Sequence, residues 1–339
     1  MLDKGPNELR VVTPSESTLI RHCRWVHIHD GLWLADEFGV TKGNRVKFVA
    51  YPDRLVAPIK RPPYRYYWKE SLPRFPLEFW SEVLAYHIGS VVAVPVPPCF
   101  PATYRQMLET EHEIDRIGSL SLSLVEPSKG EELIHGGDLL SIIKPDYERR
   151  KGAEHSVQLI LKALDGLIGD ISLYALFFRQ LVFDALIGNS DRHQDNWGIR
   201  ATIVENMQSK FEMLPAFDNG TSLGRELEEA KIRSCLNNQD EIEGFIRRGK
   251  AHVRWDGTVG AEHLQHEELM RRHLQTFPKS RRVFDEIINF NESALRRAVG
   301  RVCRLSRDSG PELDVSISPA REEFINRVIL RRRELLRSL

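Results

Sequence analysis

The sequence predicts an α+β protein with two lobes, a β-rich amino-terminal lobe that contains one helix and a mainly α-helical carboxy-terminal lobe. The chain has 339 residues and is 41% hydrophobic, which is enough for a core in each of two lobes. Its amino-terminal part is rich in aromatic and β-branched residues separated by Gly and Pro, a composition typical of strands. Beyond residue 150, long stretches carry apolar residues at helical spacing.

The amino-terminal lobe is expected to cover residues 1–128. Its strand patterns are HIHDGLWLADEF (27–38), NRVKFVAY (44–51) and YRYYWKE (64–70). One stretch differs, because LEFWSEVLAYHIG repeats apolar residues at helical spacing and is followed by a proline cluster. We expect a single helix behind the sheet that stops at Gly89. A short connection near 122–130 then leads to the second lobe.

The carboxy-terminal lobe is expected to cover residues 129–339. HSVQLILKALDGLIG (155–169) and SLYALFFRQLVFDALIG (172–188) are long helical patterns, whereas KFEMLPAF (210–217) is typical of a strand. The terminal RVILRRRELLRSL (327–339) predicts an amphipathic helix whose arginines lie in water. Its packing residues would be Ile325, Val328, Leu330 and Leu335. The alternative is that the arginines meet an acidic partner or RNA.

Charge and cysteine content narrow the class of protein. Lys plus Arg equals Asp plus Glu at 48 each, so no global field favours nucleic acid or anionic membrane, and direct nucleic-acid binding is not expected. The four cysteines are far apart and form no C-x-x-C pair, which argues against a zinc ribbon and a disulfide framework. No apolar signal segment and no run of about 18 apolar residues is visible. We expect a cytoplasmic protein without a membrane span.

The motif GNSDRHQDNWG (188–198) concentrates polar side chains after an apolar helix. Asp191 and Asn196 are five residues apart, and Asp218 follows later in AFDNGTSLG. Phosphoryl transfer needs a carboxylate that orients the acceptor hydroxyl, and an Asn and a second carboxylate that hold Mg²⁺. Gly220 is expected to let the backbone turn sharply after Asp218. For the first motif alone, a solvated turn capped by its own side chains is the alternative.

These two motifs resemble the catalytic and metal-binding loops of the HipA-like kinases, and more distantly those of phosphatidylinositol 3- and 4-kinases. The matching features are D-x-x-x-x-N in GNSDRHQDNWG and D-x-G in AFDNG. The resemblance implies a protein-kinase-like fold, with ATP and Mg²⁺ as cofactors. It implies Asp191 as the catalytic Asp, Asn196 and Asp218 as Mg²⁺ ligands, and an active-loop role for His193. Asp184 is interpreted as a helix-surface charge.

A kinase-like amino-terminal lobe needs a strand lysine that meets the phosphates and a glutamate on the helix behind it. Lys69 ends the aromatic strand pattern RYYWKE, whereas Lys60 in PIKRPP is flanked by prolines that disfavour a regular strand. We expect Lys69 to fill this role and Glu82 to be its partner, with Glu78 as the alternative. RYYWKES and EFWSEVLAYHIG also resemble HipA-like segments, so the resemblance covers about 40–225. The alternative is that Lys69 and Glu82 are each an ordinary charged residue exposed to solvent.

Three further features are less specific. DEFGVTKGNRVKF offers Gly39 and Gly43 as a phosphate-covering loop but matches neither Walker A nor G-x-G-x-x-G, and Lys47 after it is expected to face solvent. Adenine is expected to lie against LSLVEP (122–127). EHLQHEELMRRH invites a metal site, but a charged helix or loop is the favoured interpretation. The three histidines concerned are His263, His266 and His273.

The sequence therefore predicts an ATP- and Mg²⁺-dependent phosphotransferase, a HipA-like Ser/Thr protein kinase whose protein substrate is left open. The alternatives are a phosphoinositide-type lipid kinase and a non-catalytic binding module that keeps the kinase shape. The resemblance also suggests a toxin restrained by a small DNA-binding antitoxin. Compared with the longer HipA proteins, the chain is expected to lack their extra amino-terminal subdomain.

Overall fold

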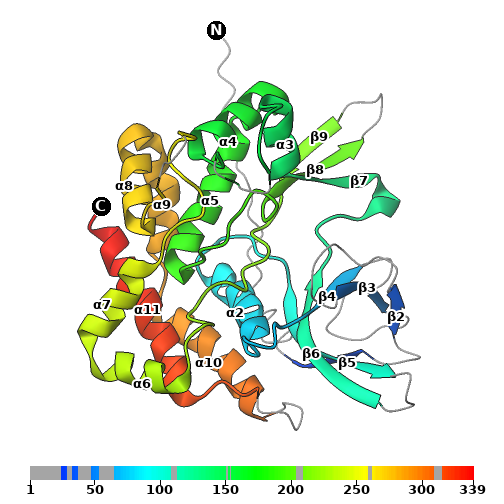
Figure 1. The fold of residues 1–339 in the computed structure, drawn as a ribbon, viewed down its shortest axis with the longest axis vertical. Helices are drawn as coiled ribbons and strands as arrows, with labels where there is room; N and C mark the ends of the chain where they lie inside the picture. Colours follow the sequence, from blue (N-terminus) through cyan, green and yellow to red (C-terminus); the bar gives the residue numbers. More distant parts are fainter. Residues whose placement is uncertain are drawn as a thin grey trace.

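The computed structural model describes ten stretches of the chain. They are residues 24–28, 33–36, 47–52, 65–107, 113–149, 152, 154–203, 209–258, 262–308 and 315–339. Together they form a mixed α+β fold, so the α+β part of the prediction is confirmed (Figure 1). Gly39, Gly43 and Lys60, which the sequence singled out, lie outside the described residues.

Six strands of the amino-terminal part form one sheet. Its strands are β1 (Val26–Ile28), β2 (Trp33–Asp36), β3 (Lys47–Pro52), β4 (Tyr66–Glu70), β5 (Cys99–Met107) and β6 (Glu113–Leu122). Their spatial order is β1-β5-β6-β4-β3-β2, with β1 parallel to β5 and the other neighbours antiparallel. The predicted strand at 27–38 is thus divided between β1 and β2, which lie on opposite edges of the sheet.

The helix expected behind the sheet is α2 (Glu78–Val91). It packs against β5 and β6 on one side and against α10 (Glu292–Asp308) on the other. Every residue from Glu78 to Gly89 is buried, because both faces of the helix are covered. The helix runs through Gly89, the expected stop, because its hydrogen bonds continue to Val92, whose N–H donates to the carbonyl of Ile88 (3.0 Å). Beyond this point Ala93 has a left-handed backbone, with φ +56°, which cannot continue the helix.

A second sheet of three antiparallel strands follows the short helix η2 (Pro127–Lys129). Its strands are β7 (Glu131–His135), β8 (Gly198–Ile203) and β9 (Ser209–Met213), in that order. The sequence predicted a strand only near β9, so the expectation of a mainly helical region was incomplete here. Figure 1 shows this small sheet beside α3 (Gly136–Ile143) and α4 (Val157–Ala163).

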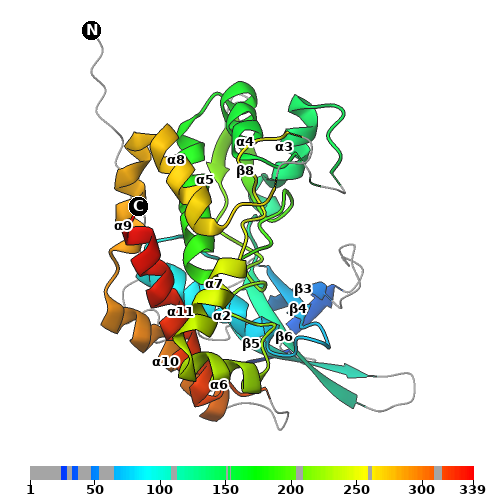
Figure 2. The same cartoon turned by 60° about the vertical axis from the view of Figure 1, so that its left-hand side comes forward.

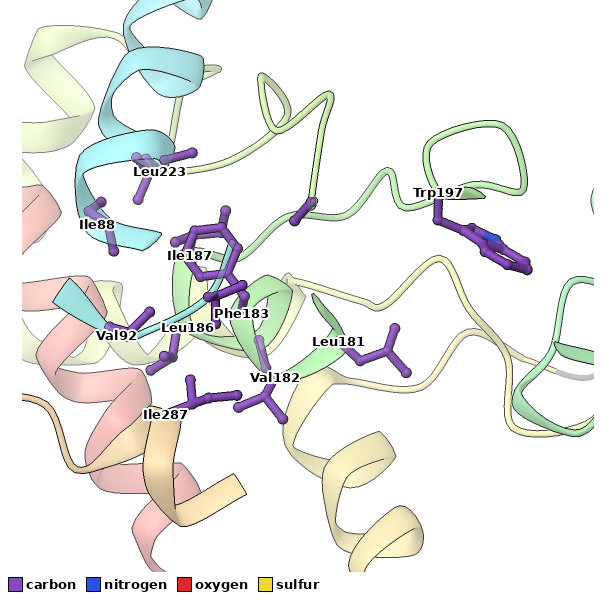
Figure 3. Packing of buried hydrophobic residues seen from close by; sticks show 14 of the residues in the cluster. Ile88, Val92, Leu181, Val182, Phe183, Leu186, Ile187, Trp197, Leu223 and Ile287 are labelled. Atoms are coloured by element: carbon purple, nitrogen blue, oxygen red, sulfur yellow. The ribbon is translucent and has the colours of Figure 1, made fainter. Parts of the chain in front are cut away.

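The remaining helices are η3 (Leu164–Ile168), α5 (Ser172–Ile187), α6 (Glu229–Asn237), α7 (Gln239–Arg248), α8 (His266–Thr276), η5 (Pro278–Ser280), α9 (Arg281–Ile288) and α11 (Pro319–Arg337). Of these, α8, α9 and α11 pack against α5, and α6 and α7 pack against α11. Figure 3 shows side chains of α2, α5 and α9 gathered in one cluster with Leu223. This core fixes the end of α5, where the polar motif begins. Among the helices of the described residues, none has the length and apolar character needed to cross a bilayer.

The last helix, α11, is packed more deeply than its sequence predicts. It contacts α5, α6, α7 and α10, and Figure 2 shows it in red between these neighbours. Ile325 and Val328 are buried as expected. The arginines were expected to lie in water, but Arg332 and Arg333 are buried because helices cover both sides of α11. The expectation was therefore wrong for these two side chains.

Candidate active site

Strand β4 and helix α2 bring Lys69 and Glu82 together. The ammonium of Lys69 lies 3.3 Å from Oε1 of Glu82 and also forms an ion pair with Oδ1 of Asp218, 149 residues further along the chain. The other oxygen of Glu82 accepts a hydrogen bond from the backbone N–H of Asn219 (2.8 Å). Burial raises the pKa of Glu82, and the nearby ammonium of Lys69 opposes that rise. Glu82 therefore ties the sheet to the loop that carries Asp218.

Glu78, the alternative partner of the lysine, has a different position. Its Oε1 lies 2.8 Å from Nη1 of Arg225, and both side chains are largely buried. Glu78 lies one helical turn before Glu82 on the same face of α2, yet the two carboxylates pair with different cations. The structure thus pairs Lys69 with Glu82 and places Glu78 beside Arg225.

The polar motif begins where α5 ends. Gly188 has φ +71°, and its N–H and that of Asn189 both donate to the carbonyl of Asp184 (2.8 and 3.0 Å). This left-handed residue is the common way to end a helix, and glycine adopts it without steric cost. The side-chain oxygen of Asn189 then accepts the N–H of Asp191 (3.1 Å). The chain therefore leaves the helix in a fixed direction at the expected catalytic residue.

Arg192 connects the two loops of the site. Its guanidinium pairs with Asp184 (2.7 Å) and donates to the carbonyl of Asn196 (2.8 Å), to the carbonyl of Phe217 and to Oδ1 of Asn219 (2.7 Å). Asp184 is 2% exposed, so its interpretation as a helix-surface charge was wrong. The ion pair of Arg192 with Asp184 was not predicted. Arg192 lies inside the polar motif, whereas Asp184 lies eight residues earlier in an apolar helix.

Asp191, His193 and Asn196 lie on one short loop. The side-chain amide of Asn196 donates to the backbone carbonyl of Asp191 (2.7 Å), and Nδ1 of His193 accepts a hydrogen bond from the backbone N–H of Asp195 (3.1 Å). Thr221, from the second loop, donates to Oδ2 of Asp191 at 3.5 Å. Burial raises the pKa of Asp191, while the neighbouring His193 lowers it and Asp218 raises it further. A carboxylate in this setting binds a proton more readily than one in water.

Asp218 has a left-handed backbone, with φ +55°. The sharp turn was expected at Gly220, but glycine is required at this position because a side chain would collide with α2. A β-carbon there would lie 2.8 Å from Oε1 of Glu78 and 3.1 Å from Oε1 of Glu82. Glycine therefore allows the loop to approach the two carboxylates of α2, while the unusual conformation falls on Asp218 itself.

A cavity of about 850 Å³ lies between the six-stranded sheet and these loops. Its polar end is lined by Lys69, Glu82, His193, Asn196 and Asp218, and its apolar side chains include Phe48, Val96, Leu122, Leu124 and Phe217. Lys47, which was expected to face solvent, is partly buried and also lines the cavity. The register explains this position, because Lys47 of β3 lies directly opposite Lys69 of β4. The cavity thus combines an apolar end with a cationic and acidic end.

The polar end fits Mg²⁺ and a nucleotide phosphate. The side chain of Asp218 is 41% exposed, and Asn196 lines the same cavity with its amide nitrogen turned toward Asp191. Carboxylate and amide oxygens are the ligands that Mg²⁺ prefers, and it takes the rest from water and phosphate. The volume is in the range of sites for small molecules. Asn196 and Asp218 would hold the cation, and Lys69 would meet the phosphates.

The histidines near α8 do not form a second metal site. His266 and His273 lie within α8 and are buried in the core, as the helix interpretation requires. His263 precedes the helix, and its Nδ1 lies 2.9 Å from the carbonyl of Ala251. The residues that the structure describes contain no group of three or more His, Cys, Asp or Glu side chains arranged to hold a metal ion.

The fold is shared with a solved protein kinase, and the chain is also similar in sequence to one. The crystal structure of the Helicobacter pylori proinflammatory kinase CtkA superposes with a TM-score of 0.64 and 19% identity, covering 89% of this chain and 92% of that chain. The Serine/threonine-protein kinase CtkA of H. pylori is 26% identical over 220 residues, which is 62% of this chain. The match spans 59% of the length of that relative. No protein-family model matches the chain.

Proposed function

We propose that the protein is an ATP- and Mg²⁺-dependent phosphotransferase that acts as a Ser/Thr protein kinase. The contact of Lys69 with both Glu82 and Asp218 at the polar end of the cavity carries this proposal. In kinases a strand lysine meets the phosphates, a helix glutamate holds that lysine, and a loop aspartate binds the metal. The three side chains here have those chemical types, come from those kinds of element and lie in contact.

In this proposal each side chain has a separate role. Glu82 holds the ammonium of Lys69 in position for the α and β phosphates, and Asn196 and Asp218 hold Mg²⁺, which neutralises phosphate charge when bound. Asp191 orients the acceptor hydroxyl or takes its proton, and its raised pKa makes proton uptake easier than for a solvated carboxylate. His193 lies on the same loop and is assigned to the catalytic loop as a positioning residue.

The proposal extends to the HipA-like type and to the two lobes. The cavity is lined from one side by strands β3 to β6 and from the other by the loops after α5 and β9. Residues 1–128 and 129–339 would then be the two lobes, with the adenine against the segment 122–127 that connects them. The similarity to a Ser/Thr protein kinase favours a protein acceptor over a lipid headgroup.

Transfer of label from γ-labelled ATP with Mg²⁺ tests the proposal. We would compare wild type with Asp191→Asn in a cell lysate supplemented with mixed lipid vesicles. The variant is expected to lose about 10²- to 10⁴-fold of its activity, the range for removal of a general base. Asp165→Asn, at an exposed position of η3, is the matched control and is expected to retain activity.

Each result has a defined meaning. Label on protein bands that disappears in the Asp191 variant supports a protein kinase, and label in lipid alone supports the phosphoinositide-kinase alternative. Binding of ATP without transfer to any acceptor favours the non-catalytic module. The toxin role stays a prediction, and co-expression with a small helix-turn-helix protein from a neighbouring reading frame, followed by co-purification, would test for the antitoxin.

A further inference from the structure

A second cavity, of about 620 Å³, borders the proposed catalytic loop. Ser190, which precedes Asp191, lines it, and so does Thr221, whose hydroxyl donates to Oδ2 of Asp191 (3.5 Å). His193 and Asn196, from the same loop, line the first cavity instead. The loop therefore lies between the two cavities, and the second one borders both the residue before Asp191 and the hydroxyl that donates to its carboxylate.

The second cavity carries an excess of positive charge. Its lining contains four cationic side chains and one carboxylate, that of Glu226. Arg225 is paired with Glu78, but Arg248 and Lys250 are exposed and form no ion pair with any described residue. The fourth cation is Arg332. A low-dielectric wall with unbalanced positive charge concentrates anionic ligands.

Arg332 is the most unusual of these cations. It is 4% exposed, and within the described parts of the chain its guanidinium forms no ion pair and makes one long hydrogen bond, from Nη1 to the carbonyl of Ala185 (3.4 Å). Nε has no hydrogen-bond partner there. Burial lowers the pKa of Arg332 to about 10, and the carboxylate of Glu226 opposes this shift.

The other buried arginines of the described chain are compensated. Arg192 pairs with Asp184 (2.7 Å), Arg321 with Glu229 (3.0 Å) and Arg333 with Glu292 (3.2 Å). A buried charge without a partner destabilises the fold, so an arginine kept only for packing would be expected to have one. Arg332 thus forms no ion pair with a described residue, and the exposed carboxylate of Glu226 acts on its charge only at longer range.

Two glycines allow the guanidinium of Arg332 to lie close to the backbone that borders the second cavity. A β-carbon on Gly188 would lie 2.6 Å from Nη2 of Arg332, and one on Gly249 would lie 3.1 Å from the same atom. Both glycines line the second cavity. The absence of side chains at these two positions lets the guanidinium reach the cavity wall, where an anion in the cavity can contact it.

We propose that the second cavity is the acceptor-substrate site and that it binds an acidic segment of a protein, with a carboxylate or phosphoryl group near the acceptor Ser or Thr. This inference rests on the proposed kinase function. Arg332 contacts the anionic group, and Arg248 and Lys250 attract the segment at the exposed rim. A guanidinium binds carboxylate and phosphoryl oxygens in paired hydrogen bonds, which suits this role.

Peptide binding, measured by fluorescence anisotropy, tests the site without requiring catalysis. The probes are a labelled serine peptide flanked by aspartates, a matched peptide flanked by asparagines, one flanked by lysines and one with a neighbouring phosphoserine. We expect wild type to bind the aspartate and phosphoserine peptides roughly tenfold or more tightly than the asparagine peptide, as is typical of a desolvated charge pair. In Arg332→Gln the ratio of the affinity for these acidic peptides to the affinity for the asparagine peptide should fall toward one.

Two further variants control for misfolding and for non-specific effects of charge. Arg248→Gln combined with Lys250→Gln changes only exposed side chains, so it should fold and lower the ratio in part. Arg282→Gln, on the exposed face of α9 and outside both cavities, should leave the ratio unchanged. If all variants including Arg282→Gln lower the ratio equally, the preference is non-specific and the inference is wrong.

Transfer from ATP to the same peptides separates this inference from the proposed function. Acidic peptides that bind through Arg332 but receive no phosphate would support the anion site and contradict the kinase proposal. Phosphate transfer with equal preference for all peptides would support the kinase and overturn the site. Binding only to phosphatidylcholine vesicles containing a phosphoinositide, with no peptide binding, would overturn the protein segment as occupant.

Discussion

The guanidinium of Arg192 and the carboxylate of Asp184 form an ion pair in which the two side chains are 1% and 3% exposed. The pair lies at the end of α5, and the same guanidinium donates to backbone carbonyls of Asn196 and Phe217. It therefore holds Asn196, a proposed metal ligand, at a fixed separation from Phe217, the residue before the other proposed ligand, Asp218. The chemistry proposed for the site depends on this buried pair, although neither side chain would touch a substrate.

Replacement of Arg192 by Met should be strongly destabilising. It leaves Asp184 buried without a cation, at a cost of about 3–5 kcal/mol in the free energy of unfolding. The double variant Asp184→Leu with Arg192→Met removes the uncompensated charge and should recover much of that loss. It should not recover phosphate transfer, because the backbone carbonyls stay unbound. Urea unfolding and the ATP assay measure the two effects, and equal stability of the single and double variants would contradict this account.

Lys69→Met should reduce phosphate transfer by roughly 10²- to 10³-fold, the usual effect of losing one electrostatic contact to the transition state. Lys60→Met is the matched comparison, because the sequence offered Lys60 as the competing lysine. We expect it to stay close to wild type. A loss of activity confined to Lys60→Met would show that the contact of Lys69 with Glu82 and Asp218 is structural.

Substitutions of Asp218 should separate its backbone role from its charge. At φ +55° glycine is favoured, Asn is tolerated and Ala is strained by about 1–2 kcal/mol. Stability should therefore fall in the order Gly, Asn, Ala, while all three variants lose phosphate transfer because no carboxylate remains to bind Mg²⁺. Thermal unfolding and the ATP assay on the same preparations test this. An Ala variant as stable as the Gly variant would show that the backbone conformation is not strained.

The contact of Lys69 with Glu82 was predicted from short-range patterns combined with the arrangement that a kinase-like lobe requires. The aromatic strand pattern favoured Lys69 over Lys60, whereas helical spacing left both Glu82 and Glu78 open, and the structure pairs Lys69 with Glu82. The motif likewise identified Asp191, Asn196 and Asp218 by spacing, and the structure brings their loops together around Arg192. Their roles in catalysis stay predictions.

Other features depend on tertiary partners and left little signal in the sequence. Asp184 looked like a surface charge because its partner is reached only after the chain leaves α5. Strands β7 and β8 are short and pair with each other across more than sixty residues of chain, so neither has a local pattern long enough to identify it. Arg332 looked solvated because amphipathic spacing in α11 shows one packed face, whereas helices cover both.

Gly220→Ala should impair the site without changing any charge. The added β-carbon would lie 2.8 Å from Oε1 of Glu78 and 3.1 Å from Oε1 of Glu82, so α2 or the loop must move. We expect a loss of about 1–3 kcal/mol in stability, typical of overpacking, and weaker ATP binding because Glu82 is displaced from Lys69. Gly166→Ala is the control, since its β-carbon would meet only Ile143 at 3.8 Å. Equal ATP affinity in both variants would contradict the proposed crowding.

Buried histidines should make folding sensitive to mild acid. Burial lowers the pKa of His266 and of His273 to about 3 and that of His252 to about 4, below the ordinary value of 6.5. In the unfolded chain these side chains take up protons below pH 6.5, whereas in the folded chain they stay neutral, so stability is present above pH 6.5 and is lost as the pH falls. At pH 5 the loss should reach about 2 kcal/mol for each fully buried histidine.

His273→Phe tests this linkage through the slope of stability against pH. His273 stacks on Phe178 with ring centroids 3.7 Å apart, and its Nε2 lies 2.9 Å from the hydroxyl of Tyr174. The variant loses that hydrogen bond and should be less stable at pH 7.5, yet its stability should decline less steeply between pH 7 and pH 5 because one titrating group is gone. Phe178→Leu disturbs the same packing without removing a titrating group, so it should keep the wild-type slope. If urea unfolding gives identical slopes for both variants, protonation of His273 does not contribute to the acid sensitivity.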